Sequence, residues 1–262
     1  MTGSGGEGRG VWPGEHALGR NEVHVFRIPL PGPVDRVLLE RTLSPDERKR
    51  GRRFVSAEDG RRFVAARAAL RCVLARYAGE PPERLGFSYG PRGKPALASG
   101  GALRFNLAHS GSLALVAVAL GREVGIDVER VRANLEFERL SERFFSEAER
   151  TVFFGLREDL RRRAFFRCWV LKEAYLKARG DGLALPLDSF DVSFGPEGRP
   201  LVVATRPDVR ERERFSLAPI DAGPEYEAAL AFEGNKARLI LFDFDWAVFP
   251  GTGAAPHAFS FP

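Results

Sequence analysis

Two acidic residues stand two positions apart in the segment GIDVE, residues 125–129, which alternates as a β-strand does. Side chains two apart on a strand face the same side, so Asp127 and Glu129 point together while Ile126 and Val128 point toward a core. Two carboxylates this close together repel each other, and near a core the repulsion is costly unless a cation lies between them. The pattern therefore indicates a cation site, and its alternative is a solvent-exposed strand face.

A third acidic residue, Glu173, lies in the helical segment FFRCWVLKEAYLK, residues 165–177. Helical spacing puts it on one face with Phe166, Trp169 and Lys177, in a stripe that is expected to be buried. The alternative is a simple ion pair between Glu173 and Lys177, worth about 0.2–0.5 kcal/mol. Because an exposed ion pair would not need an aromatic neighbour, the stripe favours a functional glutamate.

The segment FNLAHSG, residues 105–111, presents His109 and Ser110 where a strand runs into a loop. Neighbouring side chains on an extended backbone point opposite ways, so these two residues are not a serine–histidine nucleophile pair. A histidine with a purely structural role stays open as the alternative.

Three carboxylates among basic residues limit the chemistry that the sequence allows. Carboxylate oxygens are hard ligands, which favour Mg²⁺ and a phosphate ester over zinc and thiols. The formal net charge of +5 fits an anionic partner, which could be a nucleic acid, a phosphorylated cofactor or an acidic protein. Metal-assisted phosphoryl chemistry is therefore the leading class, and a metal-dependent nuclease or nucleic-acid binder fits the same residues. The basic runs lack the interleaved aromatic residues of a nucleic-acid surface, which counts against that alternative.

The composition indicates a globular cytoplasmic protein. No apolar run reaches the length of about 18 residues that a membrane-spanning helix needs, and the Gly-rich start of the chain lacks the apolar core of a signal peptide. Cys72 and Cys168 lie in apolar helical contexts and are expected to be reduced core residues in the cytoplasm. The four histidines show no ligand spacing, so no zinc site is expected.

Apolar spacing and turn signals predict the elements that position these residues. Strands are expected at residues 24–29, 103–108, 113–120, 123–129, 190–194, 201–204, 215–218, 226–231 and 238–242. Helices are expected at residues 48–54, 57–77 and from 137 to 178. Ser44 with Glu47 and Ser146 with Glu149 are two capping boxes. Gly121 begins a two-residue hairpin signal between the third and fourth of these strands.

The order of strand, helix and strands occurs twice along the chain, in two halves of roughly 110 residues, which is the size of a small domain. This order predicts an α+β protein of two similar lobes. We expect a disordered leader at residues 1–20, an N-terminal lobe at 21–122, a C-terminal lobe at 123–249 and a loose tail at 250–262. Two internal lobes make a monomer the default.

These segments resemble the motifs of a known enzyme family. GIDVE at residues 125–129 and WVLKEAYLK at residues 169–177 are similar to the paired signatures of the 4′-phosphopantetheinyl transferase superfamily. FNLAHS at residues 105–110 resembles the family's F-N-[IL]-S-H-S motif, with Ala108 in place of its first serine, and YGPRGK at residues 89–94 resembles a family turn. GDGLALPLDSF at residues 180–190 is similar to a segment of the longer, surfactin-synthetase-activator type.

The resemblance implies two lobes related by a pseudo-two-fold axis, each a small antiparallel sheet packed with helices, with coenzyme A at their junction. It implies a holo-[acyl-carrier-protein] synthase, in which a carrier-protein serine attacks the β-phosphate of coenzyme A and 3′,5′-ADP leaves. Asp127, Glu129 and Glu173 would hold Mg²⁺, or Mn²⁺, against the pyrophosphate. Glu173 or a metal-held water would be the base, and Lys177 would neutralise a phosphate oxygen.

The same resemblance implies a set of residues that bind coenzyme A. The phosphates would be contacted by Lys94, His109, Ser110, Lys172 and Lys177, and the 3′-phosphate by Arg50, Arg61 and Arg62. One position departs from the family pattern, because the first basic position of the N-lobe helix is here Glu47. Arg48, Lys49 or Arg50 would then compensate.

The partner implied by the resemblance is an acyl or peptidyl carrier protein with an acidic helix surface. Such carriers act in fatty-acid, polyketide or non-ribosomal peptide biosynthesis. No nucleic acid and no membrane is expected as a partner.

Overall fold

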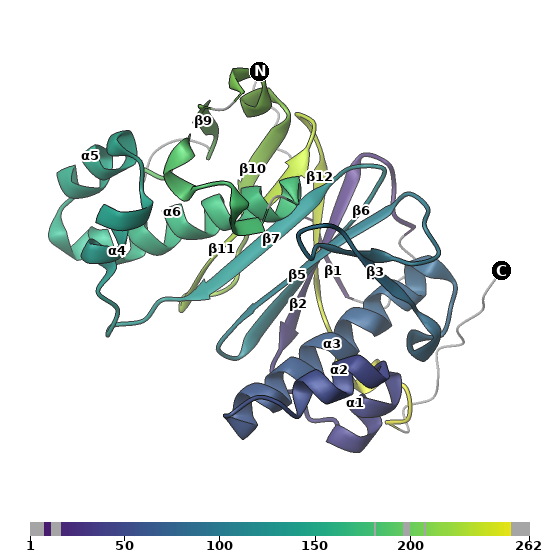
Figure 1. Cartoon of the computed structure of the whole chain (residues 1–262). Coiled ribbons are helices and arrows are strands. Elements are labelled where there is room, and N and C mark those ends of the chain that lie inside the picture. Colours follow the sequence, from purple (N-terminus) through teal and green to yellow (C-terminus); the bar gives the residue numbers. More distant parts are fainter. Residues whose placement is uncertain (1–7, 12–16, 181, 196–199, 207, 253–262) are drawn as a thin grey trace.

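The computed structural model describes residues 8–11, 17–180, 182–195, 200–206 and 208–252, and it confirms the expected α+β class. Figure 1 shows two lobes whose sheets lie between two groups of helices.

The first lobe is built on a five-stranded sheet of order β1-β12-β2-β6-β5. The strands are Gly8–Val11 (β1), Arg238–Asp243 (β12), Glu22–Pro29 (β2), Leu113–Leu120 (β6) and Leu103–Ser110 (β5). Helix Ala57–Ala78 (α3) covers one face, and Arg36–Thr42 (α1) and Pro45–Gly51 (α2) pack on α3. A short turn, Pro82–Arg84 (η1), then leads into a hairpin of Phe87–Tyr89 (β3) and Pro95–Leu97 (β4).

The second lobe is built on a three-stranded antiparallel sheet of order β10-β11-β7. Its strands are Phe215–Pro219 (β10), Tyr226–Glu233 (β11) and Val124–Arg130 (β7). Helix Glu158–Arg179 (α6) packs across one face, with Phe137–Phe144 (α4) and Glu147–Gly155 (α5) beside it. The remaining elements are the strand pair Phe190–Val192 (β8) and Val202–Thr205 (β9), and the short turns Gly182–Ala184 (η2), Leu187–Ser189 (η3), Val209–Glu213 (η4) and Trp246–Val248 (η5).

The faces of the two sheets that carry no helices meet each other. Val25 and Leu115 from the first sheet and Ile126, Val128 and Leu230 from the second lie in one buried cluster. Because side chains alternate along a strand, this cluster leaves the neighbouring carboxylates of β7 on the opposite face, toward α6. The prediction that Ile126 and Val128 point into a core is confirmed.

β6 and β7 do not form the hairpin that was predicted from Gly121, so that prediction is wrong. β6 pairs with β2 and β5 in the first sheet, whereas β7 pairs with β11 in the second. Both edges of β6 are therefore taken, and the turn at Gly121, with φ of 66°, carries the chain to the other sheet. A glycine at positive φ allows a reversal but does not decide which strands pair.

The last strand departs from the expected division of the chain. β12 lies within residues 123–249, yet it runs parallel to β2 in the sheet of the first lobe. Phe244, Trp246 and Phe249 follow it into the first lobe's core. β1, which falls in the expected leader, pairs in parallel with β12. The first sheet is thus mixed rather than antiparallel, and the first lobe takes strands from both ends of the chain.

Both predicted capping boxes are confirmed, and they make the two lobes alike. Glu47 in α2 and Glu149 in α5 each accept a hydrogen bond of 2.9 Å from the N-cap amide of their own helix, and both are buried. Each glutamate then pairs with a cation at the same position along the next 22-residue helix. Arg71 Nε lies 2.7 Å from Glu47 Oε2, and Lys172 Nζ lies 2.5 Å from Glu149 Oε1.

Candidate active site

Helix α6 crosses β7 at Gly125, where there is no room for a side chain. A Cβ atom at this position would overlap the carbonyl oxygen of Ala174 and the amide nitrogen of Ala178. Only glycine lets the two backbones approach this closely. The crossing brings Glu173 and Lys177 of α6 over the face of β7 that carries the carboxylates.

The deepest of these carboxylates is Asp127, which is paired with Lys177. Lys177 Nζ donates to Asp127 Oδ1 at 2.6 Å and to the carbonyl of Ile126 at 3.3 Å. Asp127 Oδ2 is buried and has no hydrogen-bond partner among the described residues. Burial raises the pKa of Asp127 to about 6, against the opposing charge of Lys177. One oxygen of this carboxylate is thus satisfied, and the other is not.

Glu129 and Glu173 lie within electrostatic reach of Asp127. The negative charges of both residues add to the raised pKa of Asp127. Burial also raises the pKa of Glu173, the charge of Lys177 lowers it, and the charge of Glu129 raises it further. The structure therefore places the three predicted carboxylates within electrostatic reach of one another, with Lys177 beside Asp127.

Strand β5 adds its end to this site. Ser110 Oγ donates to Glu129 Oε2 at 2.7 Å and accepts from the amide of Arg130 at 3.1 Å. The side chain of His109 is exposed. Partial desolvation and, to a smaller extent, the charge of Lys177 lower the pKa of His109. Ser110 therefore contacts one of the three carboxylates, whereas His109 lies within electrostatic reach of Lys177 and Glu129.

Asn106 also joins β5 to β7, although its place in the sequence predicted no function for it. It is buried, and its Oδ1 accepts a hydrogen bond of 2.9 Å from the amide of Ile126. A buried amide side chain that pairs with a strand edge fixes the position of that strand. The signal in the sequence was an asparagine between the apolar residues Phe105 and Leu107 of a strand.

Comparison with known proteins adds the family to this geometry. A family model described as the 4′-phosphopantetheinyl transferase superfamily matches residues 123–231, and one described as 4′-phosphopantetheinyl transferase, N-terminal, matches residues 31–120. The 4′-phosphopantetheinyl transferase HetI of a Nostoc species is 42% identical over 180 residues, which cover 67% of this chain and 76% of that protein. The chain belongs to the 4′-phosphopantetheinyl transferase superfamily.

Other members of the superfamily agree. A 4′-phosphopantetheinyl transferase of Bacillus subtilis is 31% identical over 199 residues, 76% of this chain and 85% of that protein. The transferase Sfp of the same species is 32% identical over 158 residues, 60% of this chain and 69% of that protein. A solved holo-[acyl-carrier-protein] synthase of Thermotoga maritima, 24% identical, aligns over 44% of this chain and 64% of its own with a TM-score of 0.35, a likeness too low to carry an argument.

The family assignment confirms the resemblance found in the sequence. Phosphopantetheinyl transfer is the activity of this superfamily member, and nothing supports the nuclease alternative. Within the described residues, no helix is both long enough and apolar enough to span a membrane.

In this transferase, Arg50 is exposed in the last turn of α2. Its guanidinium carbon lies 5.2 Å from the centre of the Phe63 ring, and its charge contributes to the lowered pKa of His109. The charge of Arg50 therefore reaches His109 on β5.

Arg61 and Arg62, the other two residues expected at the 3′-phosphate, lie on α3 beside acidic neighbours. Arg61 pairs with Glu58, and Arg62 lies 3.3 Å from Glu58 and 3.4 Å from Asp59. The Nε of Arg62 is buried without a partner in the described part of the chain. Arg62 therefore has an N–H donor that is available to a ligand, and the N–O distances of its two ion pairs are long.

Glu47, which replaces a basic family position, does not face the junction. It is buried, with Oε1 bonded to Arg67 Nε at 2.8 Å and Oε2 to Arg71 Nε at 2.7 Å. Burial raises the pKa of Glu47, but the two arginines and its capping bond outweigh burial and lower it. Both guanidinium groups also lie 4.9 Å from the Phe87 ring centre. Glu47 thus ties α2 to α3 and to β3.

Two of the lysines expected to bind coenzyme A are engaged elsewhere. Lys172 is fully buried in the second lobe, where it bonds Glu149 and the carbonyl of Phe190 at 2.7 Å, so it departs from the expected contact with coenzyme A. Lys94 Nζ lies 2.6 Å from Glu123 and 2.8 Å from the carbonyl of Ala178, and desolvation lowers its pKa. Lys94 therefore connects the turn between β3 and β4 to the end of α6.

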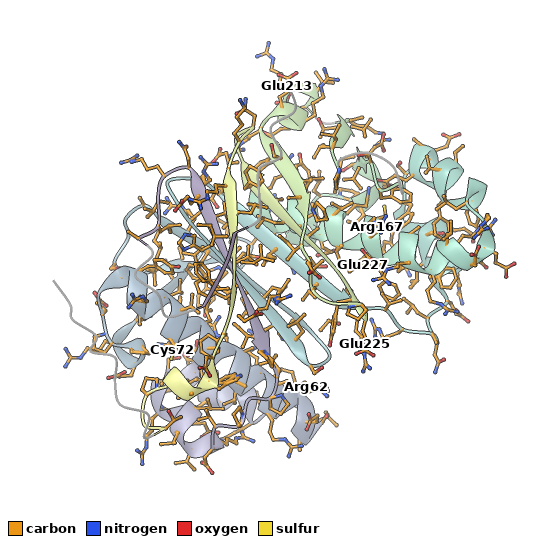
Figure 2. All side chains as sticks on the ribbon, turned by 180° about the vertical axis from the view of Figure 1, so that it is seen from behind. Arg62, Cys72, Arg167, Glu213, Glu225 and Glu227 are labelled. Atoms are coloured by element: carbon orange, nitrogen blue, oxygen red, sulfur yellow. The ribbon has the colours of Figure 1, made fainter. Side chains whose placement is uncertain are left out.

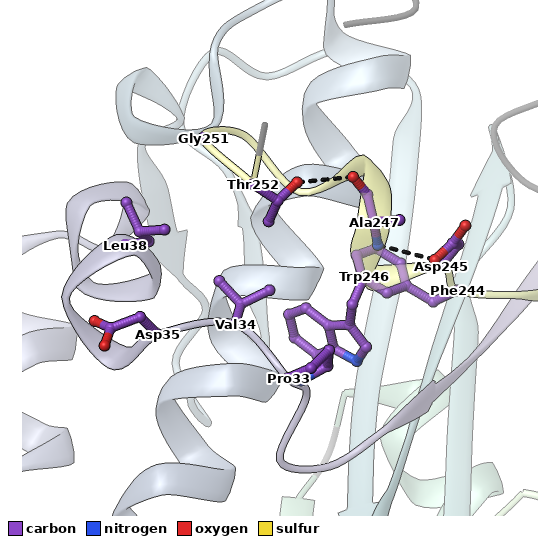
Figure 3. Close-up of a pocket in the computed structure, with 10 residues that line it drawn as sticks. All are labelled: Pro33, Val34, Asp35, Leu38, Phe244, Asp245, Trp246, Ala247, Gly251 and Thr252. Atoms are coloured by element: carbon purple, nitrogen blue, oxygen red, sulfur yellow. Dashed lines mark hydrogen bonds between the residues drawn. The ribbon is translucent and has the colours of Figure 1, made fainter. Parts of the chain in front are cut away.

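A cavity of about 610 Å³ lies in the first lobe, between α1 and η5 (Figure 3). Its walls include Val34, Leu38, Trp246 and Thr252, and the carboxylates of β7 and α6 are not among them. Its two acidic residues, Asp35 and Asp245, cap their own backbone turns. This cavity is therefore separate from the carboxylates at the crossing of α6 and β7.

Proposed function

We propose that this protein transfers the 4′-phosphopantetheine group of coenzyme A to a serine of an acyl or peptidyl carrier protein. The serine oxygen forms a bond to the β-phosphorus, the bond from that phosphorus to the bridging oxygen breaks, and 3′,5′-ADP leaves. The observation that carries the proposal is the buried, half-satisfied carboxylate of Asp127 next to Glu129 and Glu173. This is a holo-[acyl-carrier-protein] synthase reaction in the broad sense.

The donor set around Asp127 fits a divalent cation. No group of three or more His, Cys, Asp or Glu side chains in the described ranges is arranged to hold a metal ion as it stands. Even so, Asp127 Oδ2 is a buried oxygen without a hydrogen-bond partner in the described part of the chain. Burial, with smaller contributions from the neighbouring carboxylates, raises the pKa values of Asp127 and Glu173. Hard carboxylate oxygens suit Mg²⁺ or Mn²⁺. Asp127, Glu129 and Glu173 would hold the ion, which would supply charge neutralisation at the pyrophosphate of coenzyme A.

Glu173 is our candidate for the base. Burial raises its pKa, which makes it a better proton acceptor than an exposed glutamate. It would take the proton from the serine hydroxyl as the oxygen attacks. Lys177, whose ammonium already lies 2.6 Å from Asp127, would neutralise a phosphate oxygen of the leaving group.

The nucleotide end of coenzyme A would lie toward the first lobe. Arg50 and Arg62 would bind the 3′-phosphate, with Arg61 at the edge of the same surface, and His109 and Ser110 would contact the pyrophosphate. Burial and the charge of Lys177 lower the pKa of His109, which favours the neutral ring as the donor of one hydrogen bond.

The closing test is mass spectrometry of apo carrier proteins incubated with the enzyme and coenzyme A. We expect a mass gain of one phosphopantetheine on the carrier serine and an equal amount of 3′,5′-ADP. Carriers from fatty-acid, polyketide and peptide synthesis, tested in parallel, would define the pathway. A panel in which no carrier gains mass would contradict the proposed function.

The same proposal includes the location, oligomeric state and partners of the enzyme. We propose a cytoplasmic monomer that has no nucleic-acid or membrane partner.

A further inference from the structure

A second charged cluster, which we call the arginine lip, adjoins the carboxylates on the side of β11. It consists of Arg163, Arg167 and Glu227. Glu227 is the cross-strand partner of Glu129, so their side chains share a face of the sheet. Arg163 Nε donates to Glu227 Oε1, and Arg167 Nε donates to Glu227 Oε2 at 3.5 Å. Figure 2 shows Arg167 and Glu227 next to each other.

The arginine lip has two positive side chains and one negative side chain, so its charges are not balanced. Like charges directly opposite each other on paired strands are destabilising, and one cation would offset the repulsion between Glu227 and Glu129. Here two guanidinium groups share one carboxylate, so the cluster has an excess positive charge. The side chain of Glu227 is only 12% exposed, whereas those of Arg163 and Arg167 are 49% and 37% exposed. The glutamate is thus an internal anchor, and the guanidinium groups face outward.

The position of the arginine lip separates it from the nucleotide surface. β7 lies between β11 on one side and β5 on the other, because the amides of Ile126 and Arg130 bond to the side chains of Asn106 and Ser110 on β5. The residues proposed to bind coenzyme A lie at the end of β5 and on the first lobe. The lip lies beyond the carboxylates in the opposite direction. In a displacement at phosphorus, the attacking and leaving oxygens are roughly in line, so donor and acceptor approach from opposite sides.

From this arrangement we propose that the arginine lip is a docking surface for acidic side chains next to the acceptor serine of the carrier protein. The inference rests on the proposed function, because it names the surface to which the carrier protein of that reaction binds. Arg163 is further fixed by a bond of 3.3 Å from its Nη2 to the carbonyl of Tyr226. Guanidinium groups held in place by Glu227 lose less freedom when they bind a carboxylate than free side chains would.

Steady-state kinetics with a carrier that the wild-type enzyme modifies will test the inference. In Arg163→Glu and Arg167→Glu we expect the KM for the carrier to rise about tenfold. The KM for coenzyme A should stay within about twofold of wild type. Arg139→Glu is the matched control, because Arg139 on α4 is 83% exposed, pairs with Glu136 at 3.5 Å and undergoes the same change of charge. Its KM for the carrier should not change.

A reciprocal change on the carrier distinguishes contact from structure. A lysine in place of an acidic residue beside the carrier serine should recover activity with Arg167→Glu and lose it with wild type. Arg163→Gln and Arg167→Gln serve where a charge-reversed enzyme does not fold, and each should raise the KM for the carrier by a smaller factor. Rises in carrier KM no larger than that of Arg139→Glu would overturn the inference while leaving the proposed function intact. Absence of transfer by wild type to every carrier would instead contradict the proposed function.

Discussion

Lys177 and Asp127 form an ion pair that uses one oxygen of a buried carboxylate, with Nζ at 2.6 Å from Oδ1, and leaves Oδ2 without a partner among the described residues. A carboxylate that is only half satisfied inside a protein is costly. Such a cost is expected where function requires it, and two further acidic residues raise it here. The relationship sets a clear expectation for how the protein responds to pH.

The stability of the metal-free protein should depend on the titration of Asp127. Its pKa in the folded state is about 6, above its ordinary value of 3.8, so the protonated form favours folding. The free energy of unfolding should therefore rise as pH falls from above 6 toward 3.8, and this contribution is lost again as pH rises through 6. Its size is on the order of 3 kcal/mol. Urea denaturation in EDTA, compared with Asp127→Asn, measures it.

The Asn variant is the control for that prediction. Because it cannot ionise, its unfolding free energy should lack this pH dependence, and at about pH 7.5 it should be as stable as wild type or more so. If Asp127→Asn is instead markedly less stable near neutral pH, the ion pair with Lys177 is structural and the carboxylate is not held for a cation.

Gly125 should tolerate no side chain. In Gly125→Ala the new Cβ would overlap backbone atoms of α6, so the helix must move away from β7. We expect a loss of more than about 2 kcal/mol of unfolding free energy and loss of transfer, because Glu173 and Lys177 move with the helix. Gly155→Ala is the control, since a Cβ there meets nothing within 4 Å and φ is not positive. Equal melting temperatures for the two variants would show that the crossing is looser than the structure indicates.

Lys172 should matter for folding rather than for coenzyme A. Lys172→Met leaves Glu149 buried without its cation, which should cost about 3–5 kcal/mol. The double variant Lys172→Met with Glu149→Gln removes both charges and should recover much of that loss. Its KM for coenzyme A should then match wild type. A raised KM in a double variant of normal stability would return Lys172 to the binding site.

Arg62 should discriminate coenzyme A from 3′-dephospho-coenzyme A. Wild type should bind the dephospho form more weakly, because that form lacks the 3′-phosphate that Arg50 and Arg62 are proposed to bind. Arg62→Ala should lose most of this preference, with a decrease of about tenfold in affinity for coenzyme A itself. Isothermal titration with both ligands measures the difference. Equal binding of the two ligands by wild type would assign these arginines to another partner.

Much of the site followed from local sequence patterns. Strand alternation placed Asp127 and Glu129 on one face, and helical spacing placed Glu173 near Lys177, because both rules depend on backbone geometry alone. The capping box of Ser146 and Glu149 was equally local. These predictions needed no knowledge of tertiary contacts.

The errors came from contacts between distant segments. Helical spacing cannot reveal that Lys172 meets Glu149, 23 residues earlier, inside the second lobe. The same limit applies to Glu47, which reads as a lost phosphate contact until Arg67 and Arg71 are seen around it. The hairpin at Gly121 failed because strand pairing is decided by which faces are buried, and turn residues do not encode that.

The central claim is that Asp127, Glu129 and Glu173 hold a divalent cation for phosphopantetheinyl transfer. Its most direct test is the mass gain of an apo carrier protein, measured with chelator-treated enzyme and coenzyme A as Mg²⁺ is added back. We predict no transfer in EDTA, full recovery with Mg²⁺ or Mn²⁺, and almost none at any Mg²⁺ concentration for Asp127→Asn, although that variant stays folded. Full transfer in excess EDTA, or normal turnover by Asp127→Asn, would contradict the account.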